Sequence, residues 1–284
     1  MSSEDSSRVA LITGAANGLG KAMVIGLIGK GLRVAAVDKD LAGLKALQQE
    51  LGGRADPGRL ALFNEDLLSF DPDGLVARVE AQFGQTDILI NNAGVGQAQV
   101  RSDYHRHPPR FYEVTPQQWA RALAVNASAA FLLSRAAVGP MLRRKWGRIV
   151  TITTSLGTML RGGYTPYGPS KAAAEALCAV MAADLAGTGV TANVLIPGGI
   201  VNTPMIPADA PFSRDELMQP EAMLPPLYWL VSPDADAVTG RRFLAAQWDS
   251  ALAPGIAAEK AGAPIGWKDL AVLPITPKFK EGLK

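Results

Sequence analysis

The chain has 284 residues, of which 48% are hydrophobic and 19% are charged, and this composition excludes a largely disordered protein. The formal net charge of +2, without a long basic stretch, argues against nucleic acid as a partner. A single cysteine, Cys178, excludes an intramolecular disulfide framework. The two histidines, His105 and His107, lie in a polar, proline-containing stretch that does not indicate a metal site.

The sequence contains no run of 18 apolar residues, and its polar N-terminus lacks an apolar signal core. We therefore expect a soluble, cytoplasmic protein that does not span a membrane.

Short apolar runs alternate with longer helical stretches from Arg8 onward. The runs predict strands at Val9–Thr13, Arg33–Val37, Leu60–Phe63, Ile88–Ile90, Ile149–Thr153, Thr191–Leu195 and Arg242–Ala246. The stretches between them predict helices near residues 20–30, 40–51, 72–83, 115–143 and 167–187. Strands that are apolar on both faces indicate a parallel sheet covered on both sides. Right-handed crossovers then give a single-domain α/β fold of the Rossmann type, with a doubly wound parallel sheet.

The domain organisation follows from the same pattern. We expect a disordered tail at residues 1–7, a Rossmann domain at 8–246 and a C-terminal extension at 247–284. Prolines in the extension favour an extended wrap over a further domain. Segments 97–113 and 203–226 interrupt the strand and helix rhythm, and we expect them to shape a substrate site.

A glycine-rich turn follows the first predicted strand and reads Gly14-Ala15-Ala16-Asn17-Gly18-Leu19-Gly20. Glycine lets the backbone approach a pyrophosphate, and the N-terminus of the following helix offers free N–H groups. A purely structural tight turn uses glycine too. The position after the first strand of an α/β chain favours the phosphate-binding interpretation.

Asp38 ends the second predicted strand. A carboxylate there can accept hydrogen bonds from the adenosine ribose and would repel a 2′-phosphate, which favours NAD over NADP. No basic residue occupies positions 15–17, although Lys39 is adjacent to the carboxylate. The alternative is that Asp38 only caps the helix that begins near Leu41.

Tyr167 and Lys171 lie four residues apart at the start of a predicted helix, so their side chains share one face. A tyrosine with a pKa of about 10 needs roughly 4 kcal/mol of stabilisation to act as a base near neutral pH. One cation about 4 Å away supplies about 4 kcal/mol at an effective dielectric constant of 20. The ammonium of Lys171, together with a positively charged nicotinamide, would lower the pKa of Tyr167 by this means. The alternative is an ordinary surface pair.

Three motifs together resemble the short-chain dehydrogenase/reductase family. They are the TGxxxGxG turn, the sequence Asn91-Asn92-Ala93-Gly94 after the fourth strand, and the YxxxK motif Tyr167-Gly168-Pro169-Ser170-Lys171. The resemblance covers residues 8 to about 245 and implies the catalytic set Asn126, Thr154, Tyr167 and Lys171.

Thr154 stands thirteen residues before Tyr167, where the family usually has serine. Its hydroxyl can both donate and accept a hydrogen bond. Ser155 is the neighbouring candidate, but along an extended chain it should face the other way.

The resemblance also implies contacts with a nicotinamide dinucleotide. Asp66 and Leu67 would lie at the adenine, and Ile200 and Thr203 at the nicotinamide carboxamide. The full implied set is Gly14, Asn17, Gly18, Leu19, Gly20, Asp38, Asp66, Leu67, Asn92, Gly94, Tyr167, Lys171, Ile200 and Thr203.

We therefore expect an NAD-dependent oxidoreductase that interconverts a secondary alcohol and a ketone, with Tyr167 as the general acid and base. Its partner would be a small-molecule alcohol or ketone, and the resemblance implies a homodimer or a homotetramer. The alternative is a non-catalytic NAD-binding sensor or scaffold on the same fold.

Overall fold

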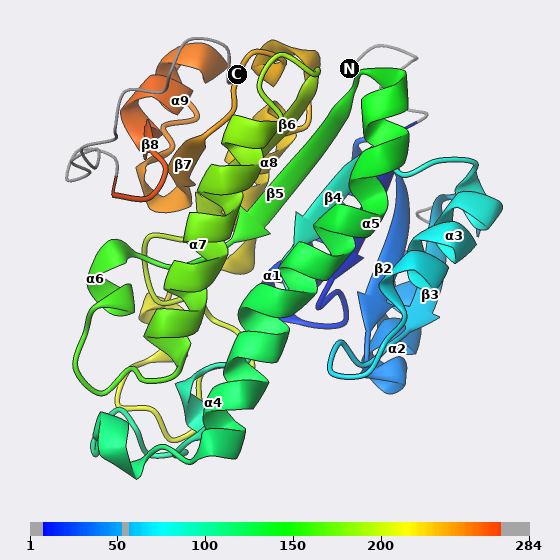
Figure 1. Cartoon of the computed structure of the whole chain (residues 1–284). Coiled ribbons are helices and arrows are strands. Elements are labelled where there is room, and N and C mark those ends of the chain that lie inside the picture. The colour runs from blue at the N-terminus through cyan, green and yellow to red at the C-terminus, as the bar shows by residue number, and fades with distance from the viewer. Residues whose placement is uncertain (1–7, 53–56, 268–284) are drawn as a thin grey trace, which may run out of the picture.

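A single eight-stranded sheet organises residues 8–52 and 57–267, which are the residues that the computed structural model describes (Figure 1). The strand order is β3 (Leu60–Asn64), β2 (Arg33–Asp38), β1 (Val9–Thr13), β4 (Ile88–Asn91), β5 (Gly147–Ile152), β6 (Val190–Ile196), β7 (Arg241–Leu244) and β8 (Gly262–Pro264). Neighbouring strands are parallel except β7 and β8, which pair antiparallel. The expected Rossmann-type α/β fold is confirmed.

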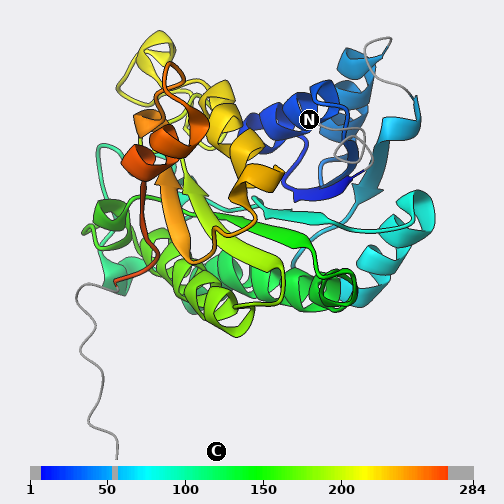
Figure 2. The ribbon, with the colours of Figure 1, turned by 90° about the horizontal axis from the view of Figure 1, so that it is seen from above.

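Two helical layers cover the sheet (Figure 2). One face carries α1 (Gly18–Gly29), α2 (Leu41–Leu51), α8 (Leu224–Leu230) and α9 (Pro254–Ala261). The other carries α3 (Pro72–Phe83), α5 (Ala129–Arg144) and α7 (Tyr167–Asp184). Two further helices are α4 (Pro116–Leu123) and α6 (Leu156–Met159).

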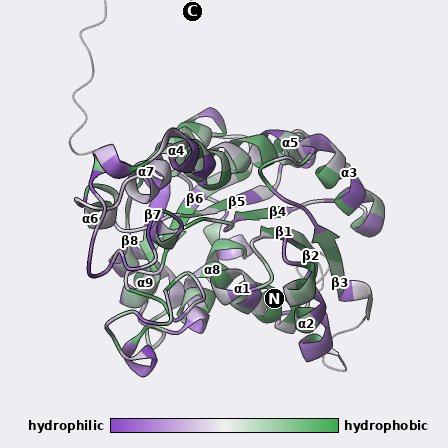
Figure 3. Ribbon diagram, turned by 90° about the horizontal axis from the view of Figure 1, so that it is seen from below, coloured by the Kyte–Doolittle hydropathy of each residue, from purple (hydrophilic) through white to green (hydrophobic). Residues whose placement is uncertain are grey.

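β1 shows why the strands could be read from the sequence. All five of its residues are buried. Ala10 and Ile12 belong to the hydrophobic cluster that contains α1, whereas Val9 and Leu11 belong to the cluster that contains α5. A strand buried on both faces is a continuous apolar run, and Figure 3 shows the central strands as hydrophobic between the two layers. Full burial of one such side chain stabilises the fold by about 1.5–3 kcal/mol.

Side-chain caps fix several helix starts close to the predicted positions. The Asp40 carboxylate accepts a hydrogen bond from the Gly43 amide at 2.9 Å and begins α2. Asp71 caps α3 in the same way through the Gly74 amide, and Gly84 ends that helix with a positive φ of 87°.

The predicted helix at 115–143 is divided in the structure. α4 is followed by a π-helical turn at Ala124–Ser128, and α5 continues to Arg144. Such a turn adds a residue to one helical circuit and re-aims its side chains. Here it carries Asn126, which is buried.

The C-terminal extension differs from the extended wrap that its prolines predicted. Pro254 lies in the first turn of α9, where proline is compatible with a helix, and an alanine-rich stretch completes that helix. β8 then pairs with β7, with Ala263 opposite Arg242. The predicted tail at 1–7 and residues 268–284 of the extension lie outside the described residues.

One continuous helical stretch of the described residues, Pro116–Arg144, is long and apolar enough to cross a membrane by length and composition. Core helices of soluble proteins meet the same criterion, and α5 supplies Leu133, Ala137 and Met141 to a core cluster on the sheet.

Candidate active site

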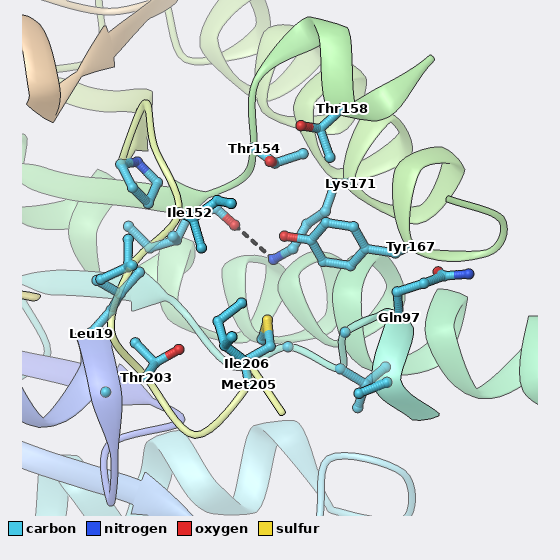
Figure 4. A pocket seen from close by; sticks show the side chains of 18 of the residues that line it. Leu19, Gln97, Ile152, Thr154, Thr158, Tyr167, Lys171, Thr203, Met205 and Ile206 are labelled. Carbon is cyan, nitrogen blue, oxygen red and sulfur yellow. Dashed lines mark hydrogen bonds between the residues drawn. The ribbon is translucent and has the colours of Figure 1, made fainter. Parts of the chain in front are cut away.

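A cavity of about 600 Å³ lies where β1, β4, β5 and β6 end. Carboxyl ends of parallel strands meet at one edge of the sheet, so the turns that follow them converge there. Most residues of these turns line the cavity, within the ranges 14–19, 92–99, 153–155 and 197–206. Figure 4 shows the side chains around Tyr167 and Lys171.

The backbone of the glycine turn leaves no room for a side chain at Gly14 or Gly20. Gly14 and Gly18 have positive φ angles of 65° and 54°. A Cβ atom on Gly14 would lie 2.8 Å from the Ala93 Cα, and one on Gly20 would lie 1.9 Å from the Gly14 carbonyl oxygen. Gly14 and Gly18 line the cavity, whereas Gly20 serves the close approach of α1 to the turn.

The start of α1 keeps its free backbone N–H groups. Asn17 is the N-cap residue, but its side chain makes no capping hydrogen bond. Its Nδ2 instead donates to Asp40 Oδ2 at 3.3 Å. Asn17 and Leu19 both line the cavity, as predicted. Uncapped N–H groups and a positive helix-dipole end fit an anionic pyrophosphate.

Asp38 turns toward the glycine turn. Its Oδ2 accepts a hydrogen bond from the Ala16 amide at 3.0 Å, and its Oδ1 accepts one from the Asp40 amide at 3.0 Å. Asp38 lines the cavity and is half-buried. The helix-capping alternative is therefore wrong, because Asp40 caps α2.

Asn92 ties the ends of β1 and β4 together. Its Nδ2 donates to the carbonyl oxygens of Thr13 at 2.8 Å and Gly14 at 3.1 Å. Its backbone amide donates to the Thr13 hydroxyl oxygen at 3.0 Å. Gly94 packs closely against Lys171, since a Cβ on Gly94 would lie 3.2 Å from Lys171 Nζ. Both residues line the cavity.

Asp66 and Leu67 are not among the described residues that line the cavity. Asp66 is exposed, and its Oδ1 accepts a hydrogen bond from the Leu68 amide at 3.0 Å. Leu67 packs against the core cluster that contains α3. Their contact with an adenine stays a prediction.

Tyr167 and Lys171 project from the first turns of α7 into the cavity (Figure 4). Lys171 Nζ donates to the Ile152 carbonyl oxygen at 2.8 Å. Burial lowers the pKa of Lys171 from 10.5 to about 8.

The pKa of Tyr167 reflects the burial of its side chain. Burial raises this pKa above 10.0, and the hydrogen bond with the Thr154 side chain opposes that rise. Desolvation of the phenolate is the largest influence on this pKa. Tyr167 is therefore a phenol at neutral pH.

Thr154, and not Ser155, faces the tyrosine. The Thr154 side chain lies near the phenol of Tyr167 and lowers its pKa. Ser155 instead caps α6, because its Oγ accepts from the Thr158 amide at 3.2 Å and lies 2.7 Å from Thr158 Oγ1.

Asn126 lies behind the cavity lining. Its Oδ1 accepts from the Val95 amide at 2.8 Å, and its Nδ2 donates to the Val95 carbonyl at 3.0 Å and to Ser170 Oγ at 2.8 Å. These bonds join the segment after β4 to α7. Asn126, which was predicted to be catalytic, therefore lies near Lys171 but does not line the cavity.

A buried ion pair behind Thr154 was not predicted. Arg242 Nε lies 2.8 Å from Glu175 Oε1, and the side chains are 7% and 0% exposed. The Thr153 hydroxyl donates to Glu175 Oε2 at 2.9 Å, and Arg242 donates to the Thr154 carbonyl at 3.1 Å. The sequence signal that could have indicated this pair is Glu175, an acidic residue in the otherwise apolar stretch AAAEALCAV.

The two predicted substrate segments meet over the site. Arg106 donates to the Asp209 carbonyl at 3.3 Å, and the rings of His105 and Phe212 are 4.9 Å apart. Ile200 and Thr203 line the cavity as predicted. Further lining residues that the sequence did not single out are Gln97, Tyr104, Thr158, Tyr164, Met205 and Ile206.

No group of three or more His, Cys, Asp or Glu side chains in the described part of the chain could hold a metal ion.

The chain is similar in sequence to known proteins of one family. The sequence model for the family described as short chain dehydrogenase matches residues 8–211. The 3-oxoacyl-acyl-carrier-protein reductase FabG of Escherichia coli (strain K12) is 31% identical over 193 residues, which cover 68% of this chain and 73% of the relative. The D-threitol dehydrogenase of Mycolicibacterium smegmatis is 34% identical over 191 residues, which cover 67% and 69%.

Two solved structures have the same fold. The 3-ketoacyl-(acyl-carrier-protein) reductase from Brucella melitensis, complexed with NADH, has a TM-score of 0.72 and 27% identity over 84% of this chain and 95% of that chain. A putative NAD(P)-dependent gluconate 5-dehydrogenase from Beutenbergia cavernae, with bound NADP at low occupancy, has a TM-score of 0.71 and 31% identity over 84% and 94%.

Proposed function

Because the chain belongs to the short-chain dehydrogenase family, we propose that it is an NAD-dependent oxidoreductase that interconverts a secondary alcohol and a ketone. The observation that carries this proposal is the cluster of Thr154, Tyr167 and Lys171 in the same cavity as the glycine turn. A cytoplasmic location belongs to the same proposal.

The residues around the cavity fit a nicotinamide dinucleotide. The pyrophosphate would lie on the glycine turn, where a Cβ on Gly18 would come within 2.9 Å of Thr203 Cγ2. The half-buried Asp38 carboxylate would accept hydrogen bonds from the adenosine ribose and disfavour a 2′-phosphate. The similar gluconate 5-dehydrogenase structure contains NADP, so the test of this preference is to compare the binding of NADH and NADPH.

The catalytic roles follow from the hydrogen bonds. The Thr154 hydroxyl would orient the substrate oxygen toward the phenol of Tyr167, near which it lies. The raised pKa keeps Tyr167 protonated at neutral pH, the form that donates a proton to a ketone oxygen. In the reverse direction the phenolate would accept the proton of the alcohol, and the positive charges of Lys171 and of a bound oxidised nicotinamide would stabilise this anion. When bound, the nicotinamide would accept or supply the hydride.

Lys171 would hold a positive charge beside this pair. Below its pKa of about 8 the side chain is an ammonium, and one of its protons is bonded to the Ile152 carbonyl. The remaining protons can serve the phenol and a ribose hydroxyl.

The test is steady-state turnover of NAD⁺ with a panel of secondary alcohols, beside a fluorescence titration with NADH. Tyr167→Phe keeps the ring but removes the acid, and we expect kcat to fall by about 10²–10⁴-fold while NADH still binds. Thr154→Ala should lower kcat, whereas Thr154→Ser and Ser155→Ala should be mild. NADH binding without turnover by the unmodified protein would instead identify a sensor or scaffold.

A further inference from the structure

The chain from residue 202 to residue 207 packs directly on the glycine turn. A Cβ atom on Gly18 would lie 2.9 Å from Thr203 Cγ2, and one on Gly96 would lie 2.7 Å from Met205 Cγ. Segment 202–207 therefore contacts both the glycine turn and the stretch that follows β4. The side chains of Thr203 and Met205 belong to the lining of the cavity (Figure 4).

This segment has little packing of its own to hold it there. In the described structure it contains no helix or strand and lies between β6 and the turn Arg214–Glu216. None of the described side chains at 202–207 is buried, and none belongs to either hydrophobic core cluster. A segment with few buried apolar contacts opens easily unless specific bonds fix it.

Arg214 supplies such bonds. Its Nη1 donates to Asn202 Oδ1 at 3.2 Å and to the Thr203 carbonyl oxygen at 3.0 Å. Its Nη2 donates to the carbonyl oxygens of Ile206 at 2.6 Å and Pro207 at 3.3 Å. One guanidinium thus joins both ends of the segment, because its donors are spread over separate nitrogens in a rigid plane.

The other hydrogen bonds of the segment do not replace those of Arg214. The Asn202 amide donates to the Met218 carbonyl oxygen at 2.9 Å, but this bond fixes only the first residue of the segment. The Ile206 amide donates to the Thr203 carbonyl oxygen at 3.1 Å, and this bond joins two residues of the segment to each other. The later part of the segment therefore depends on the guanidinium for its place over the cavity.

We propose that Arg214 is a positioning residue that holds segment 202–207 over the glycine turn before a cofactor binds. This inference rests on the proposed function, because it concerns the dinucleotide site assigned there. Ordering a loop on binding costs free energy, so a segment that is already fixed leaves more of the binding energy for the cofactor. Arg214 is not among the described residues that line the cavity, and its hydrogen bonds do not reach Tyr167 or Lys171. Its loss should therefore weaken cofactor binding and leave the chemical step nearly unchanged.

Hydrogen–deuterium exchange without any ligand tests the positioning itself. In Arg214→Met, peptides that cover residues 202–210 should exchange at least about threefold faster than in the unmodified protein, whereas peptides of β6 and α7 should be unchanged. Arg135→Met is the matched control. Arg135 also donates a hydrogen bond, to Asp73 Oδ2 at 3.2 Å, but its side chain is exposed on α5 and does not line the cavity. Equal exchange of the segment in the unmodified protein and in Arg214→Met would overturn the inference.

Fluorescence titration with NADH and steady-state kinetics test the consequence for the site. Arg214→Met should raise the Kd of NADH and the KM for NAD⁺ by about three- to tenfold, with kcat within about twofold of the unmodified protein. A general loss of folded protein would instead lower the apparent kcat and leave KM unchanged, and that result would contradict a positioning role. Arg135→Met should change none of these values.

Arg214→Lys separates geometry from charge. Lysine keeps the positive charge but carries its donors on one nitrogen, so it cannot bond both ends of the segment at once. We expect Arg214→Lys to resemble Arg214→Met in exchange and in NADH affinity. Full recovery of affinity by lysine would show that the charge alone matters and would overturn the inference.

The two proposals fail separately. NADH affinity that is equal in the unmodified protein and in Arg214→Met would overturn the positioning role and leave the oxidoreductase assignment intact. An unmodified protein that binds no NADH would overturn the proposed function, and the exchange experiment would still decide whether Arg214 holds the segment.

Discussion

Single side chains decide the chemistry of this cavity, and Asp38 is the clearest case for the cofactor. Its two oxygens are held by the Ala16 and Asp40 amides, so the carboxylate cannot swing away from an incoming group. A carboxylate held in this position would repel a 2′-phosphate and would accept hydrogen bonds from ribose hydroxyls.

We predict that NADH binds at least about tenfold more tightly than NADPH, which corresponds to about 1.4 kcal/mol. Asp38→Asn keeps an acceptor for the Ala16 amide and removes the charge, so it should narrow this ratio. Fluorescence titration with both cofactors gives the dissociation constants. Equal affinities, or tighter binding of NADPH by the unmodified protein, would contradict the prediction.

Lys171 connects the site to the stability of the fold. Burial lowers its pKa from 10.5 to about 8, so the folded state binds this proton less tightly than the unfolded chain. The folded protein carries the full penalty below about pH 8, and stability from this group rises with pH until about 10.5. The total amounts to about 3 kcal/mol.

We therefore predict that the unfolding free energy of the unmodified protein, relative to Lys171→Met, increases between about pH 8 and pH 10. Urea denaturation of the two proteins at matched pH measures this difference, and shared titrations of other groups cancel. A difference that is constant or decreases with pH would show that Lys171 is not desolvated.

At the scale of elements, α7, β5 and β7 are joined by the ion pair of Glu175 and Arg242. Glu175 accepts a hydrogen bond from the Thr153 hydroxyl, and Arg242 donates to the Thr154 carbonyl. The pair therefore positions the backbone that follows β5. Removal of one partner leaves a buried charge without compensation, which typically costs about 3–5 kcal/mol.

We predict that Arg242→Met or Glu175→Leu alone destabilises the fold by roughly that amount, and that the double variant is more stable than either single variant. The double variant should still have a low kcat, because the Thr154 carbonyl has lost its donor. Denaturant unfolding and kinetics of all three variants test this. Additive losses of stability would mean that the two charges do not compensate each other.

Elements with a clear hydrophobic pattern were predicted from the sequence, and elements without such a pattern were missed. β1 was predicted residue for residue because both faces are apolar. α9 and β8 were missed because an alanine-rich, proline-bounded stretch has no clear hydrophobic period. Among site residues, the glycine turn and Tyr167 carry their own motif. Gln97 and Glu175 do not, since only the fold shows that they are buried.

For the molecule as a whole, the outer surface of the α4, α5 and α7 layer keeps large apolar side chains exposed. Trp119, Phe131 and Val180 are 41%, 49% and 58% exposed. They lie on neighbouring helices of one layer (Figure 1). Exposed apolar side chains on adjacent elements favour a protein interface.

We predict a homodimer or homotetramer with closed symmetry that buries this surface. Phe131→Glu should shift the assembly toward smaller species in light scattering at micromolar concentration. Leu41→Glu is the control, because Leu41 is similarly exposed, at 42%, on α2 of the opposite layer. A monomer in the unmodified protein, or equal effects of both variants, would refute this interface.

The bond from the Gly266 amide to Glu175 Oε1, at 3.3 Å, bears on synthesis at the ribosome. The groups that compensate the Glu175 carboxylate come from residues 153, 242 and 266, and the last two are made late. While residue 242 is still in the exit tunnel, an α7 docked as in the finished protein would bury an anion without its cation, which is unfavourable. The glycine turn obtains its contacts from Asn92 in the first third of the chain, whereas the backbone behind Thr154 obtains the last of its contacts only after translation of nearly the whole described chain.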